Sequence, residues 1–126
     1  MDENYELYHG SLKVGTVTNT DSDFPNLWGT IAYELWLSNP HSLEGARFAR
    51  FVALNKESIR LVDSEHERDT SREQAVVNAE LETEFMDYIE SEEWRLVDGR
   101  GRDLPILCPI FRDDHELVWR WDTGRM

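Results

Sequence analysis

The first third of the chain alternates apolar and polar positions in short runs. Residues 5–8 and 12–18 are rich in aromatic and β-branched side chains, and His9-Gly10-Ser11 lies between them. Gly-containing turns between two such runs are typical of a β-hairpin. Residues 28–35 alternate in the same way, so we expect a third, half-buried strand there.

The middle of the chain changes to helical spacing. Asn39 followed by Pro40 resembles a helix N-cap and first helical residue, with Ser42 as a competing cap. Apolar side chains then recur every three or four residues up to Asp63, which predicts an amphipathic helix. The charged stretch 64–69 is expected to connect this helix to the next.

A second helix is predicted from about residue 70 to about residue 92. Thr70 or Ser71 can cap it, and Glu73 would complete a capping box if Thr70 is the cap. Its apolar stripe is formed by Val77, Leu81, Phe85 and Tyr88.

The last third returns to strand-like patterns. Residues 94–97 predict a short strand, 98–103 a turn, and 104–111 an apolar strand-like run. Pro105 and Pro109 remove two N–H groups from one side of that run, so it is expected at a sheet edge or bulged. Residues 117–121 alternate strongly and predict the final strand.

The element order is therefore βββ-αα-βββ in a single domain covering residues 1–126. This order predicts an α+β fold in which an antiparallel sheet of about five to six strands packs against two helices. No apolar run approaches the roughly 20 residues that span a bilayer.

The net negative charge of the chain limits the classes of partner that it is expected to bind. The chain carries 26 acids and 13 Lys and Arg residues, giving a formal charge of −13, and the tract 80–93 contains no base. A negative field of this kind disfavours nucleic acid and anionic membranes. A basic protein is the expected partner, although a solvated acidic face is the simpler interpretation. The candidate partner-binding residues are Glu80, Glu82, Glu84, Asp87 and Glu90.

The sequence contains no catalytic motif that we recognise. Cys108 is the only cysteine, which excludes an internal disulfide, and its apolar neighbours predict an inert thiol. Asp113, Asp114 and His115 could ligate a metal, but a polar turn has the same composition. We therefore expect no metal, no cofactor and a non-enzymatic role.

The alternative hypothesis is a small-molecule-binding protein or small enzyme. Its cleft would be lined by Trp28, Trp36, Arg100 and Arg102. Aromatic and arginine side chains near turns often line such sites. Trp119 and Trp121 are expected in the core, whereas Trp28, Trp36 and Trp94 are expected to be partly exposed. A third hypothesis is a homodimer completed by an exposed strand edge or helix face.

Four segments together resemble a family of small uncharacterised bacterial proteins. They are residues 49–54 (ARFVAL), 94–98 (WRLVD), 105–111 (PILCPIF) and 118–121 (VWRW). The resemblance covers most of the chain from the first helix onward and implies a bacterial cytoplasmic setting. It implies no activity, cofactor or functional residue.

Overall fold

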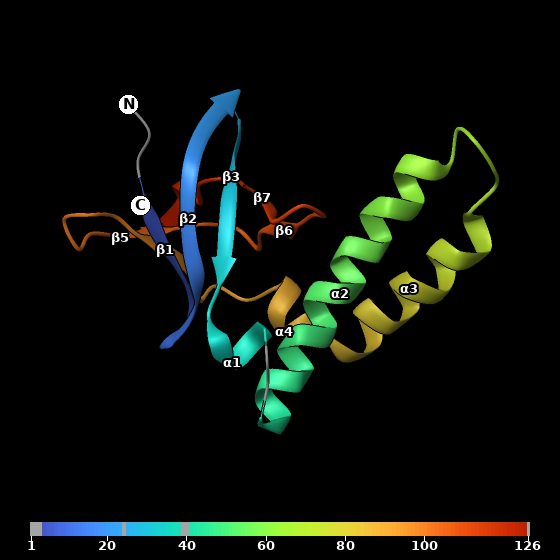
Figure 1. The fold of residues 1–126 in the computed structure, drawn as a ribbon, viewed down its shortest axis with the longest axis horizontal. Coiled ribbons are helices and arrows are strands. Elements are labelled where there is room, and N and C mark those ends of the chain that lie inside the picture. The colour runs from blue at the N-terminus through green and yellow to red at the C-terminus, as the bar shows by residue number, and fades with distance from the viewer. Residues whose placement is uncertain (1–3, 24, 39–40, 126) are drawn as a thin grey trace.

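The structure is a computed structural model that describes residues 4–23, 25–38 and 41–125. It confirms the α+β class: an antiparallel sheet lies beside a pair of long helices that project from it (Figure 1). The strands are β1 (Tyr5–His9), β2 (Leu12–Asp23), β3 (Asn26–Tyr33), β4 (Trp94–Val97), β5 (Asp103–Pro105), β6 (Ile110–Phe111) and β7 (Glu116–Trp119). The helices are α1 (Leu35–Ser38), α2 (Leu43–Ser64), α3 (Ser71–Glu84) and α4 (Met86–Ile89), and a 3-10 turn covers Thr123–Arg125.

The sheet has the strand order β5-β4-β1-β2-β3-β7-β6, with seven strands where the sequence predicted about five to six. Its first hairpin is the predicted one, with Gly10 in the left-handed region at φ 62°. Glycine adopts this conformation without steric cost, which suits the tight turn.

The proline-containing run does not form one strand. Its ends become β5 and β6, at opposite ends of the strand order, so the predicted edge position is confirmed. Between them the chain bonds to both sides of the sheet: the Ile106 amide donates to the Trp94 carbonyl, and the Leu107 amide donates to the Arg120 carbonyl. This segment thereby links β4 to the residues that follow β7, and the two edges of the sheet meet.

The core lies between the inner face of the sheet and α2. Phe48, Phe51, Trp94 and Phe111 are fully buried and their rings contact one another, with Phe48 and Trp94 centroids 5.8 Å apart. The expectation that Trp94 is partly exposed is wrong. Its indole N–H donates to the Tyr88 carbonyl at 2.7 Å, so the polar atom is satisfied inside the core.

The second long helix is interrupted, which the sequence did not predict. Phe85 has non-helical φ −129° and ψ 16°, and it separates α3 from α4. No glycine or proline causes this break. Phe85 and Tyr88 both pack on Phe51, with centroids 5.8 and 5.1 Å away. Tertiary packing of the predicted apolar stripe therefore accompanies the change of backbone conformation.

The N-terminal caps of the two long helices agree only in part with those predicted from the sequence. Ser42 caps α2 by accepting the Gly45 amide at 3.0 Å; Asn39 and Pro40 lie outside the described residues. Thr70 is buried and its hydroxyl donates to the Leu61 carbonyl, so the predicted capping box is not formed.

The third strand covers Asn26–Tyr33 instead of the predicted residues 28–35, and the short helix α1 follows it. None of the helices in the described parts of the chain is long and apolar enough to cross a membrane.

Candidate functional site

The acidic tract on α3 and α4 is partly neutralised by α2. The guanidinium of Arg50 binds both carboxylate oxygens of Glu80 at 2.8 Å, and that of Arg47 binds both oxygens of Asp87 at 2.8 and 2.9 Å. These pairs lower the pKa values of both carboxyl groups. The cations that the tract lacks in sequence are therefore supplied from the neighbouring helix.

Arg47 makes further contacts at the helix break. Its guanidinium also donates to the Glu84 carbonyl, one of the last carbonyls of α3. It stacks on Tyr88 and Phe85, 4.8 and 5.1 Å from their ring centroids. A cation in this position offsets the negative end of the helix dipole, which the carboxylates alone would make worse.

The other predicted partner-binding residues are free of such contacts. The side chains of Glu82, Glu84 and Glu90 are exposed and make no ion pair within the described residues. The five candidate residues therefore divide into two that bind α2 and three that face solvent.

A hollow of about 610 Å³ adjoins this face, between α2, α4 and the β1–β2 turn. We call it the acidic hollow, and its lining comprises His9, Gly10, Ser11, Leu12, Leu43, Glu44, Arg47, Asp87, Tyr88 and Glu93. Leu43 is 92% exposed, although it is a large apolar side chain. The hollow thus combines three carboxylates, one guanidinium and an uncovered leucine.

His9 lies in the wall of the acidic hollow. Its Nε2 atom lies 2.8 Å from the Ser91 hydroxyl, and its ring packs on Trp94 and Tyr88 with centroids 4.6 and 5.2 Å away. Burial lowers the pKa of this histidine, although Glu93 and Asp87 oppose the effect.

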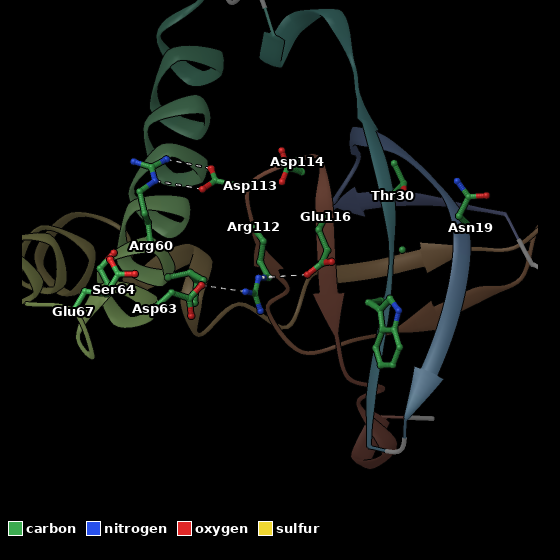
Figure 2. Close-up of a pocket in the computed structure, with 13 residues that line it drawn as sticks. Asn19, Thr30, Arg60, Asp63, Ser64, Glu67, Arg112, Asp113, Asp114 and Glu116 are labelled. Atoms are coloured by element: carbon green, nitrogen blue, oxygen red, sulfur yellow. Dashed lines mark hydrogen bonds and ion pairs between the residues drawn. The ribbon is translucent and has the colours of Figure 1, made fainter.

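A second concave surface, of about 470 Å³, lies between α2, the β6–β7 hairpin and strands β2 and β3. We call it the ion-pair groove (Figure 2). Arg60 of α2 reaches Asp113 with two hydrogen bonds of 3.1 and 3.3 Å, and Arg112 lies between Asp63 and Glu116, 3.3 Å from each. These pairs join the helix to the hairpin.

Asp113 is thus engaged with arginine. The Arg60 guanidinium holds the pKa of Asp113 below its usual range. Asp114 and His115 have φ 59°, which is the backbone that a tight hairpin turn requires. Among the described residues, no three His, Cys, Asp or Glu side chains gather so that they could hold a metal ion.

The residues of the alternative hypothesis do not meet in one site. Trp28 lines the ion-pair groove, whereas Arg100 and Arg102 line a separate hollow of about 510 Å³ beside Asp98. Trp36 lies in α1 and its indole N–H donates to the Lys13 carbonyl at 2.6 Å. The sheet positions Trp28 and the β4–β5 turn positions the two arginines, far apart in the strand order.

The arginine turn has a structural partner. The buried carboxylate of Asp98 accepts the amides of Arg100 and Arg102 at 2.9 and 3.0 Å, and the Arg102 guanidinium at 2.7 Å. The Arg102 contacts, led by its backbone amide, lower the pKa of Asp98. The Arg102 side chain therefore supports the turn, and Arg100 is exposed.

Cys108 resembles the inert thiol that its sequence context predicts. Burial raises its pKa to about 12, so the thiol is protonated at neutral pH.

Sequence reasoning missed Arg47, Arg60 and Arg112 as organisers of these surfaces, and it missed Leu43. The signal for the first was weak but present: Arg47 and Arg50 are three residues apart on the exposed side of a predicted helix, opposite an acidic second helix. Leu43 falls at the helix start, where an apolar side chain gives no sign of exposure.

Comparison with known proteins leaves these surfaces to be judged on their own geometry. No protein-family model, curated protein or solved structure matches the chain.

Proposed function

We propose that the protein is a non-enzymatic interaction module that binds a basic protein partner. The binding surface is the solvent face of α3 and α4 together with the acidic hollow. The observation that carries the proposal is the group of exposed carboxylates without an ion pair among the described residues, Glu82, Glu84 and Glu90. They belong to the same helical segment as Asp87 and Tyr88, which line a hollow with an uncovered leucine.

Charge and apolar contact have different roles in this proposal. The carboxylates would steer a cationic partner and raise its association rate, an effect that falls with salt. Leu43, which lines the hollow and is 92% exposed, would supply the apolar anchor that exposed charges lack. A basic segment with one apolar side chain matches both features.

The binding set differs from the fold-supporting set. Glu80 and Asp87 bind Arg50 and Arg47, so changing them would disturb the contact between α2 and the α3–α4 segment. Glu82, Glu84 and Glu90 can be changed without breaking a described ion pair. We assign binding to these three and to Glu44, which lines the acidic hollow.

The test compares two charge-matched double variants. Glu82→Lys/Glu90→Lys reverses the proposed face, and Asp21→Lys/Asp23→Lys reverses two exposed acids on β2, near its turn to β3. Tagged wild-type and variant proteins are incubated with lysate of the source cells at low and moderate salt, and the retained proteins are identified by mass spectrometry.

We expect wild type and the β2 variant to retain a basic protein that the α3–α4 variant does not retain. Leu43→Ser should also weaken its retention, with less dependence on salt. Equal loss in both double variants would mean that net charge alone retains the protein, and the assigned face would be wrong.

A second candidate function is favoured by one observation, the presence of Trp28 in a defined groove. It is small-molecule binding, as in the alternative sequence hypothesis, with Arg60 and Arg112 in place of Arg100 and Arg102.

Setting and assembly are part of the proposal. A single protonated thiol and a strongly negative charge support a cytoplasmic role without nucleic acid. A homodimer would use an exposed helix face, such as that bearing Val76, because the chain between β5 and β6 links the two edges of the sheet. Light scattering tests that assembly directly.

A further inference from the structure

The ion-pair groove contains a tryptophan that the core does not need. Along β3, Ile31 is 1% exposed and faces the core, whereas Trp28 and Thr30 belong to the alternate positions. Trp28 is half-buried and pairs with Val118 of β7. Its indole and the side chain of Ile59 therefore supply apolar surface to a groove whose other side chains are polar.

The polar groups around it are held in place and retain unused hydrogen-bonding capacity. A guanidinium has five N–H donors. Arg60 uses three on Asp113 and Glu57, and Arg112 contacts Asp63 and Glu116 through two nitrogens. Carboxylate oxygens accept more bonds than these pairs supply. The groove thus presents both donors and acceptors.

The uncharged side chains of the lining also provide both hydrogen-bond donors and acceptors. Asn19, Thr30 and Ser64 lie around the groove, and each side chain can both donate and accept. The lining has five carboxylates against two guanidinium groups, which disfavours phosphates, nucleotides and other anions. A ligand suited to this site has an apolar ring face and several hydroxyl groups, because each hydroxyl can both donate and accept a hydrogen bond.

We propose that the ion-pair groove binds a neutral sugar of the hexose type, with the sugar ring stacked on Trp28 and its hydroxyls bonded to the Arg60–Asp113 and Arg112–Glu116 pairs. This names the ligand class for the second candidate function and rests on it, whereas the proposed protein interaction uses a different surface. The groove volume of about 470 Å³ lies in the usual range for small-molecule sites, roughly 300–1,000 Å³.

The experiment is saturation-transfer difference NMR on the whole protein. The probes are glucose, galactose, mannose, N-acetylglucosamine, maltose and cellobiose, and spermidine is included as an organic cation. The variants are Trp28→Leu, Trp28→Tyr and Asp114→Asn, with Asp23→Asn as an equal charge change on β2 outside the groove. Near-UV circular dichroism and thermal melting confirm that each variant is folded.

We expect saturable ring-proton signals from at least one sugar. Trp28→Leu should weaken binding roughly tenfold, as loss of an aromatic contact predicts, whereas Trp28→Tyr should retain most of it. Added salt should change sugar binding little, because the ligand carries no net charge.

Three outcomes would overturn the proposal. They are absence of a saturable signal from all six sugars with folded wild type, sugar binding unchanged in folded Trp28→Leu, and binding of spermidine alone with loss in Asp114→Asn but not in Asp23→Asn. The last outcome would assign the groove to organic cations. None of the three bears on the α3–α4 face, so the two proposals fail separately.

Discussion

Arg47 should contribute more to stability than any other exposed arginine on α2. Replacement by Met keeps much of the aliphatic stem but removes three kinds of contact: the two bonds to Asp87, the bond to the Glu84 carbonyl and the stacking on Phe85 and Tyr88. All three link α2 to the point where α3 ends and α4 begins.

The expected loss follows from the exposure of the groups. The side chains of Arg47 and Asp87 are 41% and 59% exposed, so solvent reduces the ion pair to about 0.2–1 kcal/mol. Stacking of an exposed cation adds about 0.5–1 kcal/mol, and the carbonyl bond about 0.5–1.5 kcal/mol. Because these contacts share one side chain, we expect a total near 1.5–2.5 kcal/mol, or roughly 5–10 °C in Tm for a domain of this size.

The assay is urea unfolding followed by tryptophan fluorescence, with Arg50→Met as the matched control. Arg50 binds Glu80 in the same bidentate way but has no described ring contact, so its replacement should cost clearly less. A double-mutant cycle with Asp87→Asn isolates the ion pair, and only that part should weaken in high salt. If Arg47→Met and Arg50→Met cost the same, the stacking and carbonyl contacts contribute nothing and the reasoning fails.

Three other predictions concern separate parts of the molecule. Burial lowers the pKa of His9 below 6.5, so the unfolded chain binds more protons than the folded one. The free energy of unfolding should therefore fall as the pH drops from about 7.5 to 5.5. His9→Gln should flatten this part of the pH profile, and an unchanged profile would exclude His9 as its source. Cys108, which is half-buried and has its pKa raised to about 12, should react with Ellman's reagent at pH 8 much more slowly in the native protein than after unfolding, and equal rates would contradict this protection. Gly15→Ala should destabilise the protein strongly, because the new Cβ would lie 2.5 Å from the Ala32 carbonyl oxygen, whereas Gly99→Ala, with nothing within 4 Å, should melt near wild type; equal melting temperatures would show that the sheet relaxes around the new methyl.

Local patterns predicted the elements that depend on local chemistry. The hairpin around Gly10 and the burial of the apolar stripe Val77, Leu81, Phe85 and Tyr88 both follow from spacing and residue type, and both are confirmed, although the helix that carries the stripe is broken at Phe85. The edge position of the Pro105–Pro109 run follows from two missing N–H groups. Each of these conclusions needs only residues close together in the sequence.

The candidate sites could be predicted less well, because their members come from distant segments. The sequence indicated Trp28 and the acidic tract, but Arg60 meets Asp113 and Arg47 meets Asp87 only in the folded chain, across 53 and 40 residues. Pairing of this kind depends on how α2 lies beside its neighbours, and a single sequence carries no periodicity that reports it.

Composition and periodicity by themselves determined the fold class, the negative charge and the inert surroundings of Cys108, because burial of apolar faces and the properties of each residue type follow from the order of residues. Tertiary structure decided which carboxylates remain available. Glu80 and Asp87 are held by arginines of α2, while Glu82 and Glu90 face solvent, although all four look alike in the sequence. The difference arises because an ion pair requires a geometry that only the packed helices provide.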